Sequence, residues 1–159
     1  MKNKLGLLIL VALFAITPPI IPMFAQLAPI PVVVTGAGAA TFGPGAALSG
    51  VSLSAMRFGI GVDLPGDGTA SGDFQATLSA VSRKIIVEGT ASSGSKGLTA
   101  TTFSGTCSVD LGDGSAITTG VPFTVSVATP AGGTPTLGLV IGTTTLPSAA
   151  VNAGAVRVK

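Results

Sequence analysis

The 159-residue sequence contains no histidine, tryptophan or tyrosine, and it has a single cysteine, Cys107. Without histidine there is no imidazole general base, which excludes Ser-His-Asp and Cys-His nucleophile systems and histidine-containing zinc sites. A lone cysteine excludes an intramolecular disulfide, a CxxC redox pair and a cysteine-ligated cluster. These absences remove most enzyme chemistry, so we predict a protein that is not an enzyme and has no cofactor.

Charged residues are also scarce, at 9% of the sequence, with 8 Lys and Arg against 6 Asp and Glu. Two of the basic residues, Lys2 and Lys4, belong to an N-terminal leader, and the rest of the chain is therefore neutral. A neutral chain lacks the basic surface that binds phosphates, so we do not expect nucleic acid as a partner.

Residues 1–25 have the organisation of a secretory signal peptide. Lys2 and Lys4 form the positive region, Leu5–Ile16 is apolar apart from one glycine, and prolines break the segment before Ala25, after which we place cleavage. The alternative is an uncleaved anchor, since the apolar stretch approaches the roughly 20 residues that span a bilayer. The prolines favour cleavage.

Cleavage there defines two further parts. Residues 26–31 are a proline-rich linker, and residues 32–159 form a single β-domain. We therefore expect a secreted or extracytoplasmic protein, in the periplasm or at the cell surface, with no membrane span after cleavage.

Apolar and polar side chains alternate along the domain, which is the period of a strand with one buried face. The alternating runs are Met56–Val62, Phe74–Ala80, Phe103–Leu111, Val121–Val127, Leu137–Ile141 and Val156–Val158. Shorter apolar runs at Val32–Val34 and Ile85–Val87 predict strands buried on both faces.

Turn signals separate these runs. They are Pro65-Gly66-Asp67-Gly68, Ser93-Gly94, Asp113-Gly114, Pro130-Ala131-Gly132-Gly133 and Leu146-Pro147. Short strands at near-regular spacing, without a helical period, predict an all-β fold: an antiparallel β-sandwich or a small, partly open barrel of about eight strands. Exposed edges on so neutral a chain would favour strand-to-strand association.

An apolar run, Val32–Val34, leads into Gly36-Ala37-Gly38, which resembles the start of a dinucleotide fingerprint. That mechanism needs a helix directly after the glycines to hold the pyrophosphate. Here Gly43-Pro44-Gly45 follows. We interpret the segment as a strand that enters a glycine-rich turn.

The acidic residues are the remaining candidates for chemistry. One predicted loop is surrounded by Asp63, Asp67 and Asp73, and another by Asp110 and Asp113. Carboxylates that converge from loops are one way to bind Ca²⁺. Asp-Gly is also common hairpin-turn chemistry, which explains Asp67 and Asp113 without an ion. The sequence leaves ion binding at these loops open.

Asp63 and Glu88 are the pair that an extracellular glycoside hydrolase working with carboxylates alone would use. Such sites normally add aromatic platforms for sugar rings. The absence of Trp and Tyr disfavours both this hydrolase and a carbohydrate-binding module. We therefore predict no catalytic, cofactor-binding or metal-binding residues.

Two further features have simple structural interpretations. Cys107 shares the parity of Phe103 and Val109, so we predict a thiol buried in the core rather than one that bridges to a partner. The run Thr143–Thr145 lacks the repeat of an ice- or crystal-binding face, and we predict an edge strand or loop there.

The stretch Thr101-Thr102-Phe103-Ser104-Gly105-Thr106-Cys107-Ser108-Val109, followed by Val121-Pro122-Phe123-Thr124-Val125-Ser126-Val127, resembles the core hairpin of a bacterial secreted all-β domain family of unknown function. That family pairs an AxFSGTGTV strand with a YxFTVTVTD strand. Further segments are similar to its GGGxF start, FGF strand, GHLxY segment and GGNIQVK end: Val34–Gly38 with Phe42, Phe58–Ile60, Ser71–Phe74 and Asn152–Lys159.

The resemblance covers about residues 33–159. The family's polar aromatic positions are missing here, and Ala128-Thr129-Pro130 replaces its acidic turn. The resemblance implies an exported, all-β, non-catalytic module and assigns no residue a role.

Together these observations predict an exported, non-catalytic β-domain with a structural, adhesive or protein-interaction role and an unidentified protein or cell-surface partner. The alternative is an extracellular small-ligand-binding barrel. Its ligand would be apolar and held among the alternating apolar positions, or its binding would be assisted by calcium.

Overall fold

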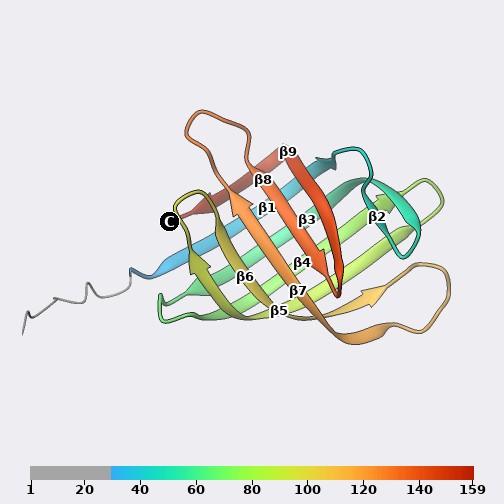
Figure 1. Ribbon diagram of the computed structural model, residues 1–159, viewed down its shortest axis with the longest axis horizontal. Coiled ribbons are helices and arrows are strands. Elements are labelled where there is room, and N and C mark those ends of the chain that lie inside the picture. The colour runs from blue at the N-terminus through green and yellow to red at the C-terminus, as the bar shows by residue number, and fades with distance from the viewer. Residues whose placement is uncertain (1–29) are drawn as a thin grey trace, which may run out of the picture.

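The computed structural model describes residues 30–159, and every regular element in that range is a β-strand (Figure 1). The strands are β1 (Val32–Phe42), β2 (Ala47–Leu48), β3 (Val51–Leu64), β4 (Thr69–Ala80), β5 (Lys84–Lys96), β6 (Thr101–Asp110), β7 (Thr118–Ala128), β8 (Thr136–Ile141) and β9 (Thr144–Val158). Within this described range, no helix is long and apolar enough to span a membrane.

Eight of the strands form a closed antiparallel barrel. Neighbours follow the order β1-β9-β8-β7-β6-β5-β4-β3, and β1 pairs with β3 as well as with β9, so the pairing of the first strand with the last closes the ring. The two-residue β2 pairs only with the start of β3. The predicted all-β fold with a small barrel of about eight strands is confirmed. The sandwich is not found, and the barrel is closed rather than partly open.

Closure also changes the expectation about strand edges. A closed barrel has no edge strand, because each strand is hydrogen-bonded on both sides. The predicted association through exposed edges is therefore wrong for the eight barrel strands.

The barrel has two distinct ends (Figure 1). At the terminal end, Val33 and Lys159 exchange backbone hydrogen bonds of 2.8 and 3.0 Å, beside the β3–β4, β5–β6 and β7–β8 loops. At the opposite end, which we call the β2 end, lie β2 and the long β6–β7 loop.

The barrel interior is packed with apolar side chains. Alternate residues point inward, as the sequence predicts, and the apolar residues of Met56–Val62 are all buried. Phe74, Phe103 and Phe123 contact one another, with ring centroids 5.7, 6.2 and 6.3 Å apart. An eight-stranded barrel is just wide enough inside for side chains to fill it.

The two short apolar runs behave differently from the prediction. Val33 is 41% exposed and Ile86 is 43% exposed, whereas Val32, Val34, Ile85 and Val87 are buried. These runs are therefore not buried on both faces. In a single-layered barrel every strand has one face toward solvent, so even an unbroken apolar run alternates between core and water.

Two of the predicted turns lie inside strands. Ser93-Gly94 belongs to β5, where a Cβ on Gly94 would collide with the Leu64 side chain, so the glycine is needed for packing. Pro147 lies in β9 at a register shift between Leu139 and Leu137 of the partner strand, where a missing N–H is tolerated. The remaining predicted turns lie in loops or bends.

Gly36 and Gly38 lie within the strand β1, and the glycine-rich turn that this strand enters is Gly43-Pro44-Gly45. A Cβ on Gly36 would be 2.6 Å from the Ala155 carbonyl oxygen, and one on Gly38 would collide with the Ala153 carbonyl. These glycines let β1 approach β9 where the ring closes. The motif serves barrel closure.

Candidate functional site

The first group of predicted carboxylates does not assemble into a site. The Asp67 Oδ1 accepts hydrogen bonds from the Thr69 backbone N–H at 2.9 Å and the Thr69 hydroxyl at 2.5 Å, and these bonds lower the pKa of Asp67 below its ordinary 3.8. Asp63 lies near the end of β3 and Asp73 on β4, and both are exposed. Across residues 30–159, no three His, Cys, Asp or Glu side chains lie together in a group that would hold a metal ion.

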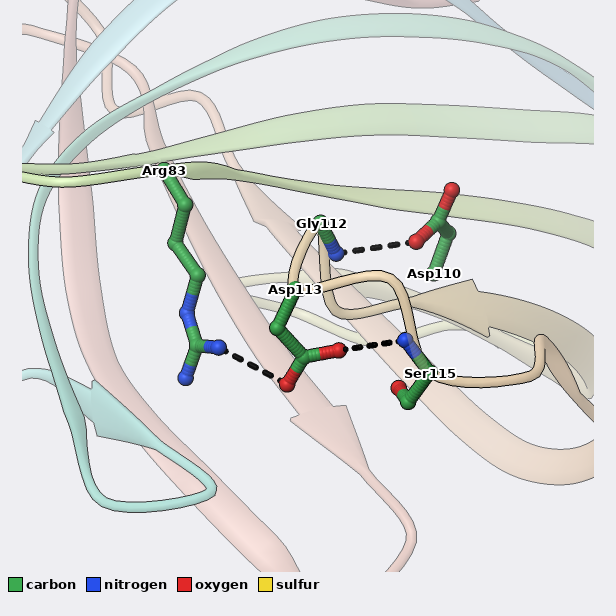
Figure 2. A network of polar contacts seen from close by, with 5 residues as sticks. All are labelled: Arg83, Asp110, Gly112, Asp113 and Ser115. Atoms are coloured by element: carbon green, nitrogen blue, oxygen red, sulfur yellow. Dashed lines mark hydrogen bonds and ion pairs between the residues drawn. The ribbon is translucent and has the colours of Figure 1, made fainter.

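The second group stabilises its own loop (Figure 2). The Asp110 Oδ1 accepts a hydrogen bond from the Gly112 N–H at 2.8 Å, and the Asp113 Oδ1 accepts one from the Ser115 N–H at 3.0 Å. Arg83 donates to the Asp113 Oδ2 at 2.8 Å. The Ser115 hydrogen bonds, and then Arg83, hold the pKa of Asp113 below its ordinary 3.8. These carboxylates fix a turn.

The structure does not bring Asp63 and Glu88 together. Asp63 pairs with Ser71 near the terminal end of the barrel, whereas Glu88 pairs with Gln75 along β5. The carboxylate that does lie near Glu88 is Asp73, from the adjacent strand.

Asp73 and Glu88 both line a hollow on the outer face of β4, β5 and β6, with a volume of about 470 Å³. We call it the outer hollow. Its lining comprises two buried residues, Phe74 and Cys107, two glycines and six polar residues. The polar residues are Asp73, Gln75, Glu88, Thr90, Thr106 and Ser108. The volume lies within the range of small-ligand sites, although such sites are usually more apolar and more enclosed.

A β-bulge shapes one side of the outer hollow. Cys107 pairs with Val121 and Val109 pairs with Thr118, so β7 has one residue more than β6 at this point. Gly120, in this bulge, has a φ of +71° and lines the hollow. A bulge bends its strand and re-aims neighbouring side chains, and glycine adopts positive φ without strain.

The two carboxylates of the outer hollow are diagonal neighbours. Asp73 is opposite Thr90, and Gln75 is opposite Glu88, so their Cα atoms are about 7–8 Å apart. The Thr90 hydroxyl donates only a long hydrogen bond, of 3.5 Å, to Asp73. Within residues 30–159 the one salt bridge is Arg83–Asp113, so neither carboxylate has a basic partner there.

A second, smaller hollow adjoins the first. It has a volume of about 210 Å³, is lined by Arg57, Gly59 and Thr77, and shares Gln75 with the outer hollow. Gln75 therefore lies between the two hollows, and Arg57 is the basic residue of the second one.

Cys107 lies beneath the outer hollow, is 4% exposed, and has a thiol pKa raised by burial. The predicted inward orientation is confirmed. Thr143 lies in the β8–β9 turn and β9 begins at Thr144, so the threonine run is partly turn and partly an interior strand of the sheet, not an edge.

Sequence reasoning named Asp73 and Glu88 but grouped them with the wrong partners, and it missed Gln75, Thr90, Thr106 and Ser108. The alternation does mark these residues as outward-facing. Their grouping depends on strand register and on the Gly120 bulge, for which the sequence has no local signal.

No family model, curated protein or solved structure matches this chain. The resemblance to the bacterial secreted family therefore stays a prediction.

Proposed function

We propose that this protein is an exported, non-catalytic β-barrel module that contacts a protein or cell-surface partner, with the outer hollow as the contact site. The N-terminal leader and the resemblance to a bacterial secreted family support export. The near-absence of catalytic side chains supports a role in contact rather than in chemistry.

The observation that carries the proposal is the contrast between the two faces of the barrel. Inside, Phe74, Phe103 and Phe123 pack against one another. Outside, the polar side chains of the outer hollow have hydrogen-bond donors and acceptors that are free to contact a partner. Side chains on paired strands are held more rigidly than side chains on loops, which favours a preformed contact surface.

Two alternatives are less well supported by the geometry. A barrel that holds an apolar ligand needs interior space, and the three packed rings occupy the space between β4, β6 and β7. A carboxylate hydrolase needs a general acid in an apolar pocket. The predicted pair, Asp63 and Glu88, and the carboxylate near Glu88, Asp73, are all exposed.

The proposal is tested with beads coated with the protein, expressed from the full sequence, and incubated with intact cells of the producing organism. Thr106→Arg fills the outer hollow and neutralises part of its charge. Thr145→Arg is the matched control, because Thr145 is exposed on β9, away from the hollow.

We expect wild-type and Thr145→Arg beads to bind cells and Thr106→Arg beads to lose binding. Equal binding by both variants would show that the outer hollow is not the contact site. Retention of the wild-type protein in the cytoplasm of the same cells would contradict export.

A further inference from the structure

We infer that the outer hollow binds a basic side chain, the guanidinium of arginine or the ammonium of lysine, that a partner protein presents. The inference rests on the proposed contact function and identifies the chemistry of the partner. It follows from the hydrogen-bonding inventory of the hollow, from its charge, and from the closure of the barrel.

The hollow is lined by groups that accept hydrogen bonds. The carboxylates of Asp73 and Glu88 only accept. The Gln75 amide and the hydroxyls of Thr90, Thr106 and Ser108 accept as well as donate. Ammonium and guanidinium groups only donate, through three and five N–H bonds. A planar guanidinium can in addition bind a carboxylate through two parallel hydrogen bonds.

The charge of the outer hollow also favours a cationic ligand. Asp73 and Glu88 lie on adjacent strands without a basic partner among residues 30–159, so they repel each other across the hollow. Arg57, in the adjoining hollow, is two strands and two residues of register from Glu88, about 12 Å between Cα atoms by strand spacing. A cation between the two carboxylates would replace this repulsion by two attractions.

Closure of the barrel decides how a partner is recognised. Both neighbours of β5 are barrel strands, so no free edge is available there for an added strand. A partner must therefore be bound through side chains. The two carboxylates repel phosphates, which disfavours nucleic acid at the hollow.

The test is a heteronuclear NMR titration of the protein, expressed from the full sequence, with N-acetyl-arginine amide. N-acetyl-citrulline amide is the matched probe, because it keeps the shape of the arginine side chain and removes the charge. Maltotriose is the third probe and represents a neutral, hydroxyl-rich ligand.

We expect arginine amide to shift the backbone amide signals around Glu88, Thr90 and Thr106, with binding that weakens as salt is added. Citrulline amide and maltotriose should leave these signals unchanged at equal concentration. The double variant Asp73→Asn/Glu88→Gln removes both exposed ion pairs and should bind arginine amide about tenfold more weakly, a loss of about 1.4 kcal/mol.

Asp63→Asn is the control variant, since Asp63 is exposed on β3 but does not line the outer hollow. It should bind arginine amide as the wild type does. Equal binding of the arginine and citrulline probes, equal loss in the control variant, or binding of maltotriose alone would overturn the inference. If Thr106→Arg still abolished cell binding in that case, the contact function would stand and only the basic partner would be wrong.

Discussion

Gly89 on β5 is a position where one added methyl group should disrupt the packing of the barrel interior. A Cβ there would lie 2.6 Å from Cε1 and 3.0 Å from Cζ of Phe123, and 3.1 Å from Cβ of Cys107. The ring of Phe123 is held by Phe74, stacked at 5.7 Å, and by Phe103, edge-on at 6.3 Å. The ring can therefore move away from the added methyl group only if its two aromatic neighbours also shift.

Overpacking of this kind typically costs about 1–3 kcal/mol. For a domain of about 130 residues, the average unfolding entropy converts 1 kcal/mol into a change in Tm of about 4 °C. Gly89→Ala should therefore lower Tm by about 4–12 °C. In urea unfolding, the midpoint should fall while the slope of free energy against denaturant stays unchanged.

Gly59→Ala on β3 is the matched control, because a Cβ at Gly59 has no atom within 4 Å. Removing backbone freedom from the unfolded chain should leave this variant as stable as the wild type or about 0.4–1 kcal/mol more stable. In a Phe123→Leu background, Gly89→Ala should lose most of its cost, since the colliding ring atoms are gone.

Two results would refute the reasoning. If Gly89→Ala were as harmless as Gly59→Ala, the three phenylalanine rings would not be tightly packed. If its cost were the same with Phe123 and with Leu at that position, the collision would not be with the ring.

Four further predictions follow from the described residues. Folding lowers the pKa values of Asp67 and Asp113 from 3.8. The ionised carboxylates therefore stabilise the fold above that pH, and this stabilisation is lost as the pH falls below it. The double variant with Asn at both positions should show a shallower loss of Tm between about pH 5 and pH 2. A thiol reagent should modify Cys107 only as fast as the protein unfolds, because the side chain is 4% exposed; rapid native modification would contradict its burial. A calcium chelator should leave Tm unchanged, because no three carboxylates lie together among residues 30–159 and Oδ1 of Asp67 is hydrogen-bonded to Thr69. A chelator-sensitive Tm that becomes insensitive in Asp67→Ala would contradict this. N-terminal sequencing of the exported protein should give Gln26 as the first residue, and a retained Met1 would favour the uncleaved anchor.

Local alternation was enough to predict most of the core. Met56, Phe74, Phe103 and Phe123 were assigned inward by parity alone, and all four are buried. Parity is reliable here because a one-residue slip would expose the whole apolar set of a strand. The prediction from alternation failed at Ile85–Val87, because in an unbroken apolar run the sequence does not show which residues face the core.

Turn signals were reliable only where the chain reverses. Pro65–Gly68 is a loop, but Gly94 and Pro147 lie within strands. Glycine and proline mark turns, bulges and close contacts alike. Which of these applies depends on the neighbouring strand, as the contact between Gly94 and Leu64 illustrates.

The amino-acid sequence by itself determined that this protein is all-β and which side chains face its core, because period-two alternation and apolar burial are properties of each strand alone. Tertiary structure decided closure and the outer hollow. Closure pairs Gly38 with Gly154, far apart in the chain, and the hollow depends on the register of β4, β5 and β6 and on the bulge at Gly120. These pairings depend on packing between strands that are far apart in the chain, and local sequence patterns carry no information about that packing.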